Sequence, residues 1–167
     1  AMTEVLDHSL TRLREFNPDI KVIITVSPIR HVADGLETNM LSKASLRVAA
    51  SRLASRFKGV VTYFPAFEIM LDDLRDYRFY AADMVHPSDV AIGYIWQSFQ
   101  AAYFDDASTQ AIARCERVMK RLTHRPMTAN REIVERFYAD TKAVVTNLVK
   151  EYPYIANIKE INDLISE

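Results

Sequence analysis

Asp83 and His86 have the residue types and spacing in this chain that are best suited to acid–base chemistry. Histidine has an ordinary pKa of about 6.5, so it can exchange a proton near neutral pH, and a carboxylate three residues earlier can hold its ring in one tautomer. Pro87 disfavours a helical conformation at His86, and Ser88 fits the N-cap of a following helix. The pair is therefore a candidate for the base half of a hydrolytic triad. In the alternative interpretation, Asp83 caps a turn and His86 is a buried polar residue with a backbone partner.

A second candidate pair follows a predicted strand. Residues 20–26 are almost wholly apolar and rich in β-branched side chains, which is typical of a parallel strand covered on both faces. In open α/β sheets ligands bind beyond the carboxyl ends of the strands, where Ser27, Arg30 and His31 are expected. Ser27 and His31 are an alternative nucleophile and base, although a serine here more often satisfies the backbone of a turn. Arg30 is a candidate for binding an anionic or polyol substrate, or for a salt bridge that supports the loop.

Two more residues are candidates for substrate binding or loop support. Asn39 lies within residues 32–41, which we expect to be a loop because both Gly35 and Asn39 tolerate positive φ. Arg78 belongs to a mixed-charge run interleaved with aromatic residues. It could brace the Asp83 loop, since a catalytic loop needs rigid support, or it could simply be solvated.

The composition restricts the classes of protein to consider. The chain has 167 residues, 49% of them hydrophobic, with 21 basic against 22 acidic residues. This balance gives no indication of a nucleic-acid surface, and no apolar run approaches the roughly 18 residues that span a bilayer. Cys115 is the single cysteine and has no nearby metal-ligand companion, which favours a reducing, cytoplasmic location without a metal site. No glycine-rich phosphate loop is present, so we expect no cofactor.

Apolar periodicity predicts the elements that must position these residues. Helices are expected over residues 3–16, 42–58, 66–74, 88–104, 108–122, 130–152 and 158–165, and strands over residues 20–26 and 60–64. The order strand, helix, strand is typical of a right-handed parallel crossover. We therefore expect a helix-rich α/β domain with a short parallel sheet over residues 1–104, and a helical C-terminal extension packed on it over residues 105–167. The helix over residues 88–104 is strongly apolar and is expected to be among the most buried elements.

Several segments together resemble one protein family. They are residues 25–31, 34–36, 39, 42–43, 63–68, 76–80 and 86–88. In residue identity and order they are similar to the GSCFA family, which resembles the SGNH hydrolases, a superfamily of esterases and acyltransferases. The resemblance implies a partial flavodoxin-like, three-layer SGNH fold. It also aligns Asp83 and His86 with the Asp-x-x-His block of that superfamily.

One departure from the family limits what this chain is expected to do alone. The N-terminal GSCFA block, which resembles the nucleophile-serine block of SGNH hydrolases, is absent, so the chain looks like the C-terminal part of the domain. The resemblance then implies a serine esterase or acyltransferase, acting on a small-molecule or carbohydrate ester, for which this chain supplies Asp83 and His86. By itself the chain is expected to be inactive, and its exposed sheet is expected to be covered by a second copy or an N-terminal segment. The alternative function is a non-catalytic scaffold or protein-interaction fragment.

Overall fold

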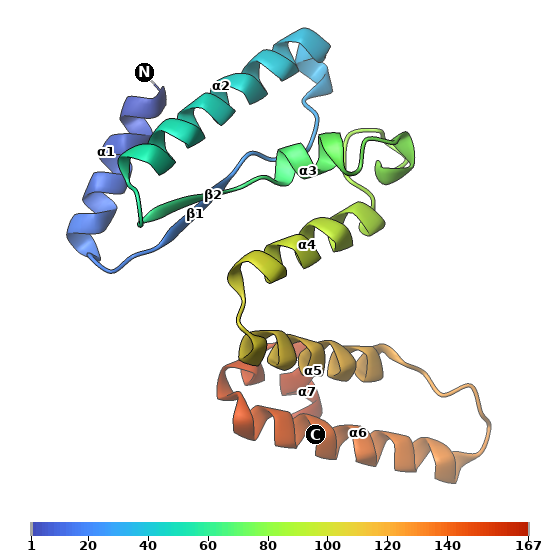
Figure 1. Ribbon diagram of the computed structural model, residues 1–167. Coiled ribbons are helices and arrows are strands. Elements are labelled where there is room, and N and C mark those ends of the chain that lie inside the picture. Colours follow the sequence, from blue (N-terminus) through green and yellow to red (C-terminus); the bar gives the residue numbers. More distant parts are fainter. Residues whose placement is uncertain (1, 167) are drawn as a thin grey trace. The chain divides into compact units, whose positions relative to one another are not determined.

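The computed structural model describes residues 2–166 of the chain (Figure 1). The chain divides into two compact units, Ala1–Ala102 and Tyr103–Glu167. The first unit contains a two-stranded sheet, and the described part of the second is built from helices. Within residues 2–166, no helix has both the length and the apolar content that crossing a bilayer requires.

The first unit alternates helices with two short strands. Its elements in chain order are α1 (Met2–Phe16), β1 (Val22–Thr25), the 3-10 turn η1 (Val32–Asp34), α2 (Gly35–Arg56), β2 (Val61–Phe64), α3 (Ala66–Asp72), the 3-10 turn η2 (Tyr77–Phe79) and α4 (Asp89–Tyr103). The strands are parallel, with Val22 opposite Val61 and Thr25 opposite Phe64. Parallel strands need a crossover connection, and α2 supplies it.

One face of the sheet packs against α1 and α2, which lie side by side over the strands (Figure 1). The buried cluster on this face contains Leu53, Phe57 and Val61, and the partly buried residues against it include Leu10 and Val22. Alternate residues of a strand point to opposite faces, so β1 places Ile23 and Thr25 on the other side. Both of these side chains are exposed. The two faces of this sheet are therefore covered unequally.

A second apolar cluster joins α3, η2 and α4. Met70, Leu74, Tyr80 and Ala91 are buried in it, with Ile69, Phe79 and Ile95 packed around them. The expectation that the helix over residues 88–104 is among the most buried was wrong. Ala91 is the buried residue of α4, whereas Val90, Ile92 and Trp96 are exposed. A sheet of two strands is too narrow to cover an apolar helix, and this leaves much of the α4 surface open.

The second unit is a small helical cluster. Its elements are α5 (Asp106–Thr123), α6 (Arg131–Glu151), the 3-10 turn η3 (Pro153–Asn157) and α7 (Lys159–Ser166). Its core contains Val118, Val145, Leu148, Ile155 and Ile161. The first two helices begin at side-chain caps, since Asp105 accepts a hydrogen bond from the Ser108 N–H and Asn130 accepts one from the Glu132 N–H.

Apolar periodicity predicted most elements to within a few residues, and the α/β class is confirmed. The exception is residues 32–41, for which the expected loop was wrong because α2 begins at Gly35. Gly35 itself has a φ of 77°, whereas Asn39 lies inside the helix and is buried. The polar side chain of Asn39 suits a helix interior here because it bonds to the preceding loop.

Candidate functional site

Asp83 and His86 form a hydrogen-bonded pair at the surface of the first unit. Asp83 Oδ2 lies 2.6 Å from His86 Nδ1, and the side chains are 49% and 58% exposed, respectively. Asp83 Oδ1 also accepts hydrogen bonds from the backbone N–H groups of Val85, at 2.9 Å, and His86, at 3.0 Å. The carboxylate therefore shapes the turn and holds the imidazole ring at the same time. His86 is not the buried residue of the alternative interpretation.

The electrostatics of the pair set the tautomer of the ring. The hydrogen bonds from the His86 N–H, the His86 ring and the Val85 N–H lower the pKa of Asp83 from 3.8 to about 2. An ionised carboxylate has acceptors alone, so Nδ1 carries the proton that lies between the two residues. In the neutral ring, Nε2 then has a free lone pair. Among residues 2–166, no hydrogen bond reaches Nε2. The pair therefore presents an oriented, accessible base.

Backbone pairing closes the loop that carries this pair. The Ala81 N–H donates to the His86 carbonyl at 2.8 Å, and the Ser88 N–H donates to the Phe79 carbonyl at 2.8 Å. Met84, between the two functional residues, has a φ of 59°. The hydroxyl of Ser88 accepts from the Ala91 N–H at 3.3 Å, so Ser88 is the N-cap that the sequence predicted for the following helix.

Arg30 joins this loop to the segment that follows β1. Its backbone N–H donates to the Val85 carbonyl and its Nη1 donates to the Met84 carbonyl, both at 3.2 Å. Its guanidinium carbon also lies 3.7 Å from the centroid of the buried Tyr80 ring. The structure thus places Arg30 as a support of the Asp83–His86 loop, which is one of the two roles considered for it.

Two buried polar residues of α2 hold the segment after β1. Asn39 Oδ1 accepts a hydrogen bond from the His31 N–H at 2.9 Å. Lys43 Nζ donates to the Ser27 carbonyl at 2.7 Å, and this lysine is 2% exposed. Lys43 was not among the candidate site residues predicted from the sequence. Its spacing of one helical turn from Asn39 is the signal that could have identified it, because residues i and i+4 share a helix face.

The remaining candidates have described partners other than Asp83 and His86. Ser27 Oγ accepts a hydrogen bond from the Ile29 N–H at 3.2 Å, which is the turn role of a serine. The described hydrogen bonds do not join Ser27 to His31. Arg78 is 74% exposed, lies 3.9 Å from Asp76, and has its guanidinium over the Phe79 ring at 5.1 Å. Within residues 2–166, no serine, threonine or cysteine hydroxyl or thiol forms a described hydrogen bond with the His86 ring.

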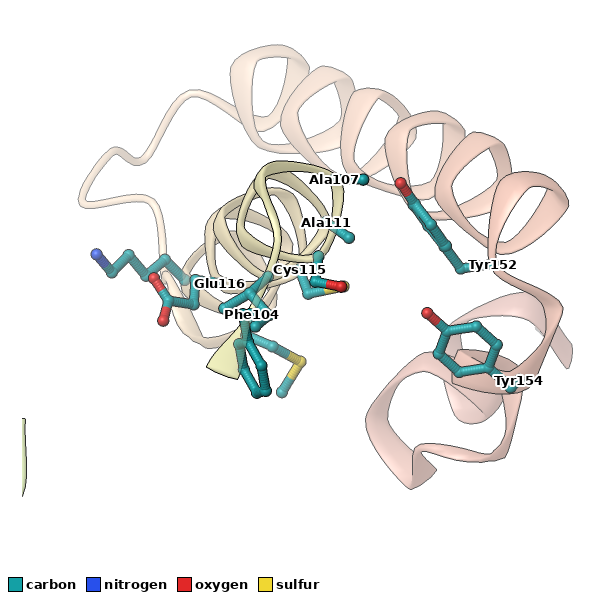
Figure 2. A pocket seen from close by; sticks show the side chains of 11 residues that line it. Phe104, Ala107, Ala111, Cys115, Glu116, Tyr152 and Tyr154 are labelled. Atoms are coloured by element: carbon teal, nitrogen blue, oxygen red, sulfur yellow. The ribbon is translucent and has the colours of Figure 1, made fainter. Parts of the chain in front are cut away.

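Two apolar cavities lie in different units. One, of about 430 Å³, lies in the first unit next to the loop of His86, and Pro87 forms part of its wall. Another, of about 750 Å³, lies in the second unit, where Figure 2 shows Phe104, Ala111 and Cys115 of the α5 region facing Tyr152 and Tyr154. The cavity in the second unit has no histidine in its lining. Residues 2–166 contain no group of three or more His, Cys, Asp or Glu side chains suited to a metal ion.

Comparison with known protein families matches the GSCFA family over residues 1–99. The match includes the Asp83–His86 loop, the segment after β1 and the buried anchors on α2. Neither a curated protein nor a solved structure matches the chain. Because the family match covers more than half of its 167 residues, this chain belongs to the GSCFA family.

Proposed function

We propose that Asp83 and His86 are the acid–base half of an SGNH-like esterase or acyltransferase site that acts through a serine. One observation carries this proposal: the ionised Asp83 carboxylate holds His86 Nδ1 at 2.6 Å, which leaves Nε2 exposed as a base. Family membership supports a hydrolase-like role. The substrate is an ester of a small molecule or an acylated carbohydrate.

The proposed chemistry assigns a role to each member of the pair. Nε2 of His86 takes the proton of a serine hydroxyl as that oxygen attacks the ester carbonyl, and it later returns the proton to the departing alcohol. Asp83 stabilises the imidazolium that forms between these steps. Backbone or side-chain N–H groups hold the oxyanion of the tetrahedral intermediate. Water or a second alcohol then accepts the acyl group, which distinguishes hydrolysis from transfer.

The serine and the oxyanion donors come from polypeptide outside the described residues. The hydroxyl of Ser27 is engaged in its own turn, and the described hydrogen bonds place no serine on Nε2. Within residues 2–166, β1 and β2 pair only with each other, so the outer edge of each strand is open to a further strand. Sheets usually have about four to six strands. We propose that a further segment of the protein, which carries the serine, completes a three-layer, flavodoxin-like arrangement; in the chain alone, a second copy covers the open sheet instead.

A second function is favoured by a specific observation. Asp83 Oδ1 accepts two backbone N–H groups, so this residue has a structural role that is independent of catalysis. A non-catalytic scaffold that retains the same loop is therefore the alternative. The two functions differ in whether a nucleophile ever reaches His86.

Labelling with a fluorophosphonate serine probe, together with p-nitrophenyl acetate turnover, tests the proposal. We expect no labelling of the chain alone, and labelling once a polypeptide that carries the family's N-terminal block is added. That labelling should disappear in His86→Ala and persist in His8→Ala, a matched change at an exposed histidine of α1. Labelling of the chain alone on the peptide that contains Ser27 would instead support the nucleophile within the chain. Absence of labelling and turnover in every arm would contradict the enzyme and favour the scaffold.

A further inference from the structure

The 430 Å³ cavity of the first unit lies against both loops of the candidate site. Pro87, the residue after His86, forms part of its wall, and so does Pro28, two residues before Arg30. The sheet contributes Ile23, Thr25 and Phe64, and α4 contributes Ile92, Ile95, Trp96 and Phe99. The cavity therefore begins where the acid–base loop ends and continues between α4 and the less covered face of the sheet.

The chemistry of the wall is almost entirely apolar. Thr25 is the lining residue with a side-chain hydroxyl, and none of the lining residues is charged. A volume of about 430 Å³ lies within the range of small-molecule sites, roughly 300–1,000 Å³. Trp96 and Phe99 stack with centroids 5.7 Å apart, and Phe99 meets Phe64 edge to face at 5.0 Å. Such a wall suits a hydrocarbon chain, since the Thr25 hydroxyl and the Trp96 indole N–H are its side-chain polar groups and it has no charge to pair with a carboxylate.

We infer that this cavity, here named the acyl pocket, binds the hydrocarbon chain of the ester whose carbonyl is placed at His86. The inference rests on the proposed function and goes beyond it by naming the substrate class: esters of medium-length, unbranched acyl groups. The polar alcohol or sugar portion would lie on the exposed side of His86, away from the apolar wall. The acyl pocket would then determine which chain lengths are accepted.

The chain carries its own reporter for this pocket. Trp96 is the single tryptophan of the sequence, and it lies in the wall. Titration of the purified chain with 2-alkanones from 2-hexanone to 2-dodecanone presents an ester-like carbonyl that has no leaving group. We expect Trp96 emission to shift to the blue, and the apparent affinity to rise about fourfold with each added methylene until the pocket is full.

Two substitutions at one exposed position test the wall. Ile92 is 54% exposed, so Ile92→Asp should leave the fold intact while lowering the affinity for 2-decanone by tenfold or more. Ile92→Phe should shorten the chain length at which the affinity levels off. Val90→Asp is the matched control, because Val90 lies on the same helix, is 69% exposed and is not part of the wall. This control should bind like the wild type.

The outcomes separate this inference from the proposed function. Suppose that the affinity for 2-alkanones rises with chain length, but no ester is turned over after the polypeptide with the family's N-terminal block is added. This result supports the acyl pocket and overturns only the proposed function. Turnover without chain-length dependence of binding or rate overturns the pocket alone. The inference also fails if Ile92→Asp and Val90→Asp behave alike. It fails equally if Trp96 emission changes with protein concentration in the absence of ligand, since a second copy would then cover this face.

Discussion

Replacing Arg30 by alanine should loosen the loop that carries Asp83 and His86. The guanidinium carbon of Arg30 lies 3.7 Å from the Tyr80 ring centroid, and Nη1 donates a 3.2 Å hydrogen bond to the Met84 carbonyl. Tyr80 is buried, so the cation–π contact contributes about 1–2 kcal/mol. The hydrogen bond contributes about 1 kcal/mol, because water can replace it at an exposed carbonyl. Arg30→Ala should therefore lower the free energy of unfolding by about 2–3 kcal/mol.

Urea unfolding followed by Trp96 fluorescence measures this loss, because Trp96 belongs to the first unit. Arg78→Ala provides the matched control. Arg78 is 74% exposed and lies 3.9 Å from Asp76, so its removal should cost less than about 1 kcal/mol. The NMR signals of the His86 ring should broaden or shift in Arg30→Ala and remain unchanged in Arg78→Ala.

The conservative variant Arg30→Lys sharpens the test. Lysine keeps the charge but lacks the planar group that stacks on Tyr80, so it should recover less than half of the lost free energy. Equal losses for Arg30→Ala and Arg78→Ala would refute the reasoning, and so would a full recovery by lysine. In either case the position of Arg30 over the ring would not be what supports the loop.

Three further predictions follow from other parts of the chain. Asp83 has a pKa of about 2 against an ordinary 3.8, so its stabilisation of the loop should be complete above pH 3.8 and should be lost as the pH falls through 2. A ¹³C NMR titration of the Asp83 carboxyl carbon measures this pKa, and a midpoint near 3.8 would contradict the prediction. Burial lowers the pKa of Lys43, so the wild-type free energy of unfolding should rise as the pH increases towards 10.5. Urea unfolding across that range should show this slope reduced in Lys43→Met, and an unchanged slope would exclude Lys43 as its source. Leu148→Ala in the second unit should cost about 2–4 kcal/mol by calorimetry, and a loss below 1 kcal/mol would mean that this core is loosely packed.

The helices and strands could largely be predicted from local patterns. The apolar periods of α1, α5 and α6 and the short β-branched runs of β1 and β2 depend on residues close in sequence, so no tertiary information was needed. The start of α2 was mispredicted because it depends on a contact outside the helix and not on a local apolar pattern. Residues 35–41 have no strong apolar period, and the helix there is stabilised by the bond of Asn39 to a loop eight residues away.

The candidate site also has one part that local sequence predicts and another part that depends on tertiary contacts. The sequence by itself determined the pairing of Asp83 with His86, because a three-residue spacing before a proline leaves the two side chains within reach of one another. Only the tertiary structure decided what holds that pair. Arg30 reaches Met84 across 54 residues, and Lys43 reaches the Ser27 carbonyl from inside a helix. Contacts of this kind depend on how α2, β1 and the loop pack together, and no local pattern of residue types encodes that packing.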